Sequence, residues 1–336
     1  MYQTYLITGA TGFLGNAVVQ LLLAHGCRVL ALVKDRDPLI YTLPNHVAVF
    51  YGDLTDKESL RDFFAAGGDD FCVLHCAGLI SIASKPDEAL YAVNVQGTRN
   101  IVDLSREFGA GRLIYVSSVH AIPEKPAPET ITEPDRFAAD EILGDYGKSK
   151  AMATALVLEA AQSGLNASVV LPSGILGPGD LARGNMTRML LAFCRGRLPL
   201  GVKGGYDFVD VRDVAAGILA CAERGRAGKC YILSGHFTSI SDLLSLAASL
   251  LGKKAAKLCI PAALASCVAP IFEKIGQLRG ERPFFTPYSI AVLRSNGHFS
   301  NAKATAALGF HARPLKETLR SMILWFQGQD LISPAL

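Results

Sequence analysis

Two residues in the middle of the chain have the types and spacing of an acid–base pair. Tyr146 and Lys150 stand four positions apart in the segment YGKSK, so on a helix their side chains share one face. A tyrosine phenol has a reference pKa of about 10, and a neighbouring ammonium group stabilises the phenolate and lowers that pKa. We therefore expect Tyr146 to pass a proton to or from a carbonyl oxygen, with Lys150 as its partner.

A serine completes the centre. Ser118 ends the apolar segment LIYVSS at residues 113–118, which is predicted to be a strand. The carboxyl ends of such strands are where open α/β sheets bind their ligands. Ser117 is a rival, but neighbouring strand residues face opposite sides, so only one of the two can enter the site. The predicted catalytic set is Ser118, Tyr146 and Lys150.

A glycine-rich stretch near the N-terminus indicates a nucleotide cofactor. The segment TGATGFLG holds Gly9, Gly12 and Gly15, and it lies between a predicted strand at residues 5–8 and a predicted helix. Glycines let the backbone approach a pyrophosphate closely, and the helix N-terminus offers free N–H groups to it. A plain turn between a strand and a helix is the alternative, which the alternating strands and helices around the stretch make less attractive.

The residues after the second predicted strand indicate which dinucleotide binds. Lys34, Asp35 and Arg36 follow the strand at residues 28–33. A carboxylate there would hold the ribose hydroxyl of NAD, whereas cations would neutralise the 2′-phosphate of NADP. Two cations around one acid favour NADP, and Asp35 leaves NAD open.

Strands and helices alternate through the first half of the chain, and the strands are continuous apolar runs. This pattern predicts an α/β fold, a Rossmann-type doubly wound parallel sheet, with a smaller and mostly helical C-terminal substrate lobe. We expect the cofactor-binding domain at residues 1–171, plus about 206–235, and the lobe at 172–205 and 236–336. Thr55 and Glu58 are predicted to form a capping box for the helix that follows the third strand.

The bulk composition excludes several classes of function. A formal charge of +3 over 336 residues gives no electrostatic reason to expect nucleic-acid binding. The apolar stretch at residues 258–272 contains two prolines and is too short to span a membrane. The eight cysteines form no C-x-x-C pair, which favours reduced thiols and a cytoplasmic location. Cys72, His75 and Cys76 are expected to bind no metal, because His75 points away from both cysteines on a strand.

The motifs together resemble those of the extended short-chain dehydrogenase/reductase family, also known as the NAD-dependent epimerase/dehydratase family. The chain is most similar to its dihydroflavonol 4-reductase-like and 3β-hydroxysteroid dehydrogenase-like branch, which includes sugar-epimerase relatives. The motifs that carry the resemblance stand in the family's order and are TGATGFLG, GDL at 52–54, HCAG at 75–78, VNVQGTRN at 93–100, YVSS at 115–118, YGKSK and LPSGILGPGD at 171–180. FVDVRDVA at 208–215 extends the likeness into the second half.

The resemblance implies roles for individual residues. It implies a Ser–Tyr–Lys centre and contacts to the adenine from Asp53 and Leu54. Asn94 would support the active site from a helix. The remaining cofactor contacts that it implies are Gly9, Thr11, Gly12, Phe13, Leu14 and Gly15 in the glycine loop, Ala77 and Gly78 at the ribose and phosphates, and Pro172 and Ser173 beside the nicotinamide.

The sequence departs from the family's pattern at two places. Lys34 replaces the acid that many of the sugar epimerases carry, which speaks against NAD-linked epimerisation. His120 and the two residues after it replace the usual tyrosine behind the serine motif. His120 either reaches the substrate from this loop or has no role there.

The second lobe is expected to contact the substrate, with Asn185 and Met186 and the segment around Phe284 and Phe285 as candidate lining. The apolar character of residues 258–293 favours an apolar or phenolic substrate. Four arginines precede that stretch, and they form either a clamp for a diphosphate or a solvated helix face: Arg183, Arg188, Arg195 and Arg197.

The predicted function is an NADP(H)-dependent oxidoreductase that interconverts a ketone or aldehyde and a secondary alcohol. The alternative is an NAD-dependent nucleotide-sugar epimerase. A dinucleotide-binding regulator without catalysis is less favoured, because serine, tyrosine and lysine are all present. The expected partner is a small-molecule substrate, with a homodimer left open.

Overall fold

The structure is a computed structural model that describes residues 1–81, 88–198, 201–253, 259–260 and 286–333. Phe284, Phe285 and most of the apolar stretch at 258–293 lie outside the described residues.

A parallel sheet of seven strands forms the centre of the molecule, in the order β10-β6-β5-β4-β1-β2-β3. The chain builds outward from β1 to β3 and then from β4 to the opposite edge, which is the doubly wound order predicted from the sequence. The strands are β1 (Thr4–Thr8), β2 (Arg28–Val33), β3 (Ala48–Tyr51), β4 (Phe71–His75), β5 (Arg112–Val116), β6 (Ala167–Pro172) and β10 (Cys230–Leu233).

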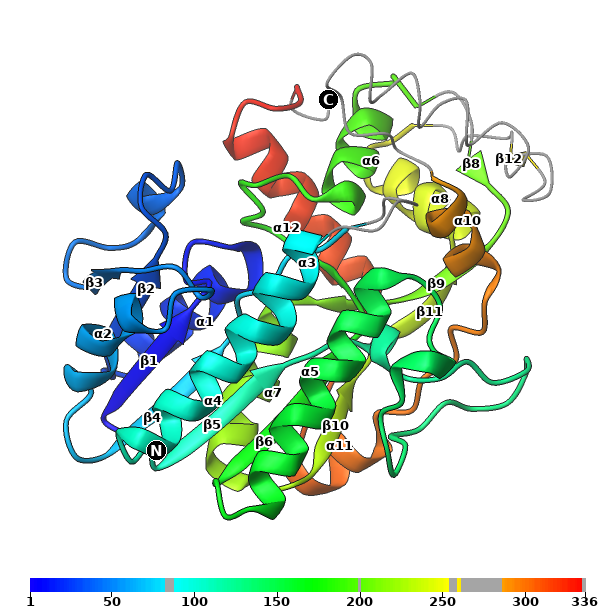
Figure 1. Ribbon diagram of the computed structural model, residues 1–336. Coiled ribbons are helices and arrows are strands. Elements are labelled where there is room, and N and C mark those ends of the chain that lie inside the picture. The colour runs from blue at the N-terminus through cyan, green and yellow to red at the C-terminus, as the bar shows by residue number, and fades with distance from the viewer. Residues whose placement is uncertain (82–87, 199–200, 254–258, 261–285, 334–336) are drawn as a thin grey trace.

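Helices cover both faces of this sheet (Figure 1). Because successive strand residues face opposite sides, Tyr5 and Ile7 of β1 join one core and Leu6 joins the other. The first core is closed by α1 (Phe13–Ala24) and α7 (Val211–Arg224). The second is closed by α2 (Arg61–Ala65), α4 (Thr98–Glu107) and α5 (Asp145–Gln162). Burial on both faces explains why the strands are apolar throughout.

A second lobe lies above the main sheet in Figure 1. Its own core contains Leu176 and Phe208, packed among helices α6, α8 and α12. The helices are α6 (Asn185–Cys194), α8 (Ile240–Leu250), α10 (Pro287–Arg294) and α12 (Leu315–Gly328). The strands are β7 (Gly174–Leu176), β9 (Gly205–Asp210) and β11 (His236–Ser239) in one small sheet, and β8 (Gly201–Val202) with β12 (Cys259–Ile260) in another.

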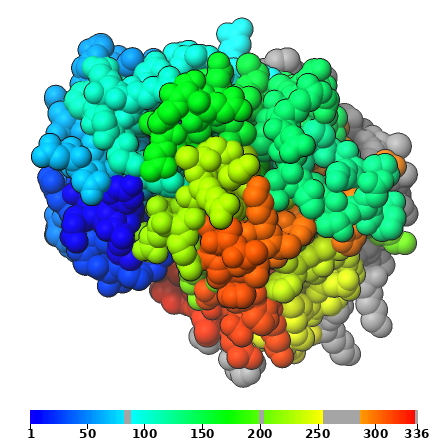
Figure 2. Space-filling view, turned by 90° about the horizontal axis from the view of Figure 1, so that it is seen from below, coloured from blue at the N-terminus to red at the C-terminus, as the bar shows by residue number. Residues whose placement is uncertain are grey.

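The chain crosses between the lobes more than once. β9 pairs with β7 and β11 in the small sheet, whereas the next two elements, α7 and β10, return to the main one. Helix α11 (Ala302–Leu308) also belongs with the first lobe, because Ala304 and Leu308 join the core around α1 and α7. Figure 2 shows this orange segment against the yellow-green residues that precede β10.

Residues 88–107 form a continuous helical segment in three parts. An α-helical turn, α3 (Glu88–Tyr91), leads into a π-helical segment at Ala92–Gly97, which continues as α4. The π-helical segment carries Asn94, and such segments are frequent at functional sites. Within the described part of the chain, no helix combines the length and apolar character needed to cross a bilayer.

Candidate active site

The glycine loop is shaped by close backbone packing. Gly9 has a φ of +72°, and a Cβ placed there would lie 2.8 Å from the backbone of Ala77. A Cβ at Gly15 would overlap the carbonyl oxygen of Gly9. Only glycine fits either position, so the first turn of α1 is pressed against the end of β1.

The start of α1 has features that suit an anion. Gly12 is the N-cap residue, no side chain caps the helix, and its first turn holds no acidic residue. The first-turn N–H groups and the positive end of the helix dipole therefore face outward without a side-chain acceptor. Thr11 is held beside them, because its hydroxyl donates to the Asp37 carboxylate at 2.7 Å. These features fit the pyrophosphate of a dinucleotide.

The residues after β2 present charge to solvent. The Lys34 ammonium lies 3.0 Å from the Asp53 carboxylate, and its side chain is 74% exposed. Asp35 and Arg36 are exposed as well. Hydrogen bonds from Thr55 and the contact with Lys34 lower the pKa of Asp53 to about 2. An exposed ion pair contributes at most about 1 kcal/mol, so Lys34 can exchange Asp53 for a phosphate group at little cost.

Tyr146 and Lys150 lie on the first two turns of α5, and both are buried. Burial raises the pKa of Tyr146 to about 12, against the opposing effect of a hydrogen bond with Ser118. The pKa of the phenol is thus raised rather than lowered, which corrects the expectation from the sequence. The Lys150 ammonium donates to the Val116 carbonyl at 2.9 Å and lies 5.0 Å from the centre of the Tyr115 ring. Burial lowers the pKa of Lys150 to about 8, so it stays largely charged at neutral pH.

The two neighbouring serines face different ways. The Ser117 hydroxyl is 2.6 Å from that of Thr154 inside the protein. The Ser118 hydroxyl accepts from the backbone N–H of His120 at 3.2 Å and also reaches Tyr146. Ser118 is therefore the serine on the side of the phenol.

A chain of hydrogen bonds with a fixed direction runs beneath the glycine loop. The Thr98 hydroxyl donates to the Asn94 carbonyl at 2.7 Å, so it accepts from His75 Nε2 at 3.0 Å. His75 Nδ1 must then accept from the Thr8 hydroxyl at 2.7 Å, which itself accepts from the Ala77 N–H at 3.2 Å. His75 is thus a neutral imidazole protonated at Nε2. In agreement, burial lowers the pKa of His75 to about 3.

The chain of hydrogen bonds continues through Asn94 to helix α5. The Asn94 amide nitrogen donates to Ser149 Oγ at 3.0 Å, and Ser149 Oγ donates to the Tyr146 carbonyl at 2.8 Å. The Asn94 side chain also clasps the backbone of Leu79, with distances of 2.8 and 3.0 Å. The backbone at Gly78 lies close to both Lys150 and Asn94. A Cβ placed at Gly78 would lie 3.1 Å from Lys150 Nζ and 3.2 Å from Asn94 Oδ1. The glycine loop, the end of β4 and α5 therefore form one connected unit.

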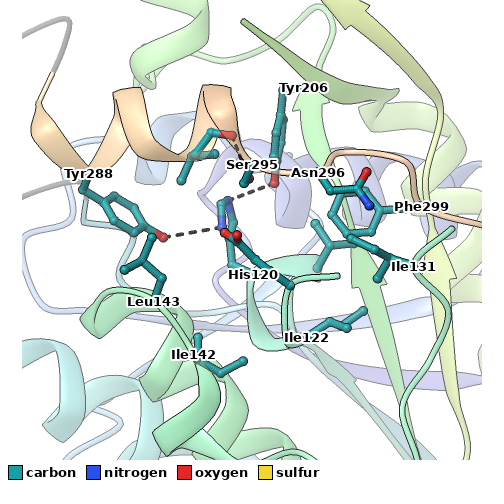
Figure 3. A pocket seen from close by; sticks show the side chains of 13 residues that line it. His120, Ile122, Ile131, Ile142, Leu143, Tyr206, Tyr288, Ser295, Asn296 and Phe299 are labelled. Carbon is teal, nitrogen blue, oxygen red and sulfur yellow. Dashed lines mark hydrogen bonds between the residues drawn. The ribbon is translucent and has the colours of Figure 1, made fainter. Parts of the chain in front are cut away.

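His120 lies where the two lobes meet, beside a small cavity (Figure 3). Its Nε2 is 2.9 Å from the Tyr206 hydroxyl and its Nδ1 is 3.4 Å from the Tyr288 hydroxyl. The His120 ring stacks on Tyr206 and meets the Tyr146 ring edge-on, each with 5.6 Å between ring centres. Burial lowers the pKa of His120 to about 4, so it is neutral. Both ring nitrogens of His120 therefore form hydrogen bonds with tyrosine hydroxyls of the second lobe.

The other expected site residues are spread more widely. Pro172 ends β6 and is followed by the buried Ser173. Leu54 packs against Gly97, where a Cβ would lie 2.9 Å away. Asn185 and Met186 begin α6 and are not among the described residues around the His120 cavity. Of the four arginines, three are exposed: Arg183, Arg195 and Arg197.

Several residues of the site have no signal in the sequence. Tyr206 and Tyr288 stand 86 and 168 positions from His120, so no local pattern links them to it. Asp37 looks like one more charge of a polar loop. His75 does have a local signal, because it stands at the carboxyl end of a strand, where open α/β sheets bind their ligands. Among the described residues, no group of three or more histidine, cysteine or acidic side chains could hold a metal ion.

The site defines a class of protein, a dinucleotide-binding α/β protein with a tyrosine-centred acid–base group. Residues 5–233 match the NAD dependent epimerase/dehydratase family. The chain belongs to this family of extended short-chain dehydrogenases/reductases, and it is an NAD(P)-dependent oxidoreductase acting on CH–OH groups.

Relatives with known names align over nearly the whole chain. A Synechocystis protein named "Putative dihydroflavonol 4-reductase" is 32% identical, over 99% of this chain and 97% of its own. "Sterol demethylase protein B" of Methylococcus capsulatus is 30% identical, over 98% and 100% of the two chains. The crystal structure of gox2253 is 30% identical with a TM-score of 0.84, covering 98% of this chain and 100% of its own. The UDP-glucose 4-epimerase of Thermus thermophilus, in complex with NAD, has a TM-score of 0.77 at 24% identity over 97% and 99% of the chains, and it shares the fold.

Proposed function

We propose that this protein is an NADP(H)-dependent reductase that interconverts a ketone or aldehyde and a secondary alcohol on a small apolar or phenolic substrate. The observation that supports this most strongly is the state of Tyr146. Its buried phenol, with a pKa of about 12, keeps its proton at neutral pH, and the Ser118 hydroxyl lies on the same side. A protonated phenol of this kind is suited to donate its proton to a carbonyl oxygen as that oxygen gains charge.

The three catalytic residues would divide the work. Ser118 would orient the carbonyl oxygen, and Tyr146 would give it a proton. The charged Lys150, anchored on the Val116 carbonyl, would stabilise the phenolate that remains. A bound nicotinamide cofactor supplies the hydride for reduction or accepts it for oxidation.

The preference for NADP rests on Lys34 and Arg36. Both are exposed after β2, where the adenine ribose binds in this type of fold, and neither is tied to a buried partner. The glycine loop would hold the pyrophosphate through the first-turn amides of α1. Gly78 and Asn94 would lie along the cofactor beside Lys150, and Pro172 and Ser173 would border the nicotinamide.

An NAD-dependent nucleotide-sugar epimerase is the second candidate. The exposed Asp35 favours it, because a carboxylate at this place suits the ribose hydroxyl of NAD, and Asp53 partly neutralises Lys34. A homodimer and a cytoplasmic location remain predictions from the sequence.

One experiment separates the two candidates. NADPH and NADH are titrated separately by fluorescence quenching, and the oxidation of each is then followed with a panel of ketones and aldehydes. A reductase should bind NADPH more tightly and consume it with at least one carbonyl compound. NAD⁺ retained through purification, with no net consumption of NADPH, would instead identify the epimerase.

A further inference from the structure

The cluster of His120, Tyr206 and Tyr288 has one more hydrogen than its internal bonds can use. A neutral imidazole has one N–H donor and one acceptor nitrogen. In one of its two contacts the ring donates to a phenol oxygen, and in the other it accepts from a phenol hydroxyl. The phenol that receives the ring N–H keeps its own hydrogen free. This holds for either tautomer.

No other described residue uses this hydrogen. Within the described ranges, each of the two phenols has His120 as its hydrogen-bond partner and no further one. The cluster is therefore a hydrogen-bond donor without an acceptor, and all three of its residues line the cavity.

The cavity is lined by apolar side chains together with this cluster, Ser295, Asn296 and Glu124. Its volume of about 40 Å³ leaves room for about three water-sized groups. Glu124 is the charged side chain among its described lining residues, and it lies at the exposed rim. The apolar lining includes Ile122, Ile131, Ile142, Leu143, Val292 and Phe299. With a neutral histidine and one carboxylate, the cavity suits an uncharged acceptor and disfavours an anion.

We propose that this cluster is a specificity subsite that binds a second, uncharged oxygen atom of the substrate, such as a hydroxyl, ether or ketone oxygen. This proposal rests on the proposed reductase function. The substrate would present one carbonyl to Tyr146 and a second oxygen to the cluster. Because the His120 and Tyr146 rings are 5.6 Å apart, both oxygens would belong to one compact apolar framework.

The cluster is also a junction between the lobes. His120 follows β5 of the first lobe, whereas Tyr206 lies on β9 and Tyr288 on α10. Tyr288 packs closely on Gly144, the residue before α5, since a Cβ there would overlap its ring. An oxygen bound in the cavity would therefore contact side chains of both lobes at once.

The test compares tetralones that carry hydrogen, hydroxyl or carboxylate at one ring position, with each ring position tried in turn. The subsite predicts that the best hydroxylated compound has a kcat/KM about 5- to 10-fold above that of the unsubstituted ketone, mainly through KM. The carboxylated compound should be the poorest. In the double variant Tyr206→Phe/Tyr288→Phe, the ratio of kcat/KM for the hydroxylated ketone to kcat/KM for the unsubstituted ketone should fall to about 1. The surface variant Tyr51→Phe should show the wild-type ratio.

Three results would overturn the subsite: equal use of all three compounds by the wild type, preference for the carboxylate, or an unchanged ratio in the double variant. If no tetralone is consumed with NADPH, the reductase function fails for this set. The dissociation constants of the hydroxylated and unsubstituted ketones are then compared in the presence of NADP⁺, by quenching of protein fluorescence. Equal binding of the hydroxylated and unsubstituted ketones would overturn the subsite independently of turnover.

Discussion

Replacing His75 by leucine would cut the hydrogen-bond chain that joins the glycine loop to helix α5, which carries Tyr146 and Lys150. The substitution removes both ring nitrogens from a side chain that is 1% exposed. The Thr8 hydroxyl loses its acceptor at 2.7 Å, and the Thr98 hydroxyl loses its donor at 3.0 Å. Neither threonine can reach water, because both are fully buried.

The size of the effect follows from these two losses. A buried polar group left without its partner costs about 1–3 kcal/mol, so two of them cost about 2–6 kcal/mol. That is a large part of a typical free energy of unfolding of about 5–15 kcal/mol. Thr8 precedes Gly9 and bonds to Ala77, so NADPH affinity should fall as well, by about tenfold if about 1.4 kcal/mol of the loss appears in binding.

The free energy of unfolding is measured by urea denaturation and the dissociation constant of NADPH by fluorescence quenching. His75→Gln should recover part of both losses, because its amide offers one donor and one acceptor. His46→Leu on the surface serves as the matched control and should stay within about 0.5 kcal/mol of the wild type. A His75→Leu protein with wild-type stability and wild-type NADPH affinity would refute the reasoning.

Three further predictions concern the cofactor site and the catalytic lysine. Lys34→Glu should weaken NADPH binding about 10-fold or more while NADH binding changes less than about threefold, as measured by fluorescence titration; equal losses for both would count against a 2′-phosphate contact. Gly15→Ala should cost about 1–3 kcal/mol in urea denaturation and abolish measurable NADPH binding, because its Cβ overlaps the Gly9 carbonyl. The kcat/KM for carbonyl reduction should be level from about pH 6 to 8 and fall above about pH 8, where Lys150 loses its proton. A profile that rises through this range would contradict the role of a charged Lys150.

The sequence was a good guide wherever the signal was local. The apolar strands, alternating with helices, predicted the doubly wound main sheet. The spacing of Tyr146 and Lys150 predicted that their side chains share one face of a helix. The capping box at Thr55 was wrong. Thr55 bonds to Asp53 through its N–H and its hydroxyl, and the first α-helical turn starts only at Arg61. The Asp53 carboxylate accepts hydrogen bonds from the Thr55 N–H and hydroxyl, so Thr55 does not cap the helix.

Features that depend on tertiary packing could not be predicted. The raised pKa of Tyr146 follows from burial by elements that are distant in the sequence, and burial outweighs the opposing effect of Ser118. The hydrogen bonds of His120 depend on Tyr206 and Tyr288, which lie on a strand and a helix of the second lobe. The same holds for helix α11, whose Leu308 packs in the first core although its sequence position suggested the second lobe.

The most direct test of the central claim compares Tyr146→Phe with the wild type in NADPH-dependent reduction of a ketone that the wild type accepts. Loss of the proton donor should lower kcat by about 100-fold or more, while the dissociation constant of NADPH changes less than about twofold. Tyr51→Phe, the same change on an exposed tyrosine, should retain wild-type kcat. A Tyr146→Phe protein that keeps full activity would contradict the proposal that this phenol donates the proton.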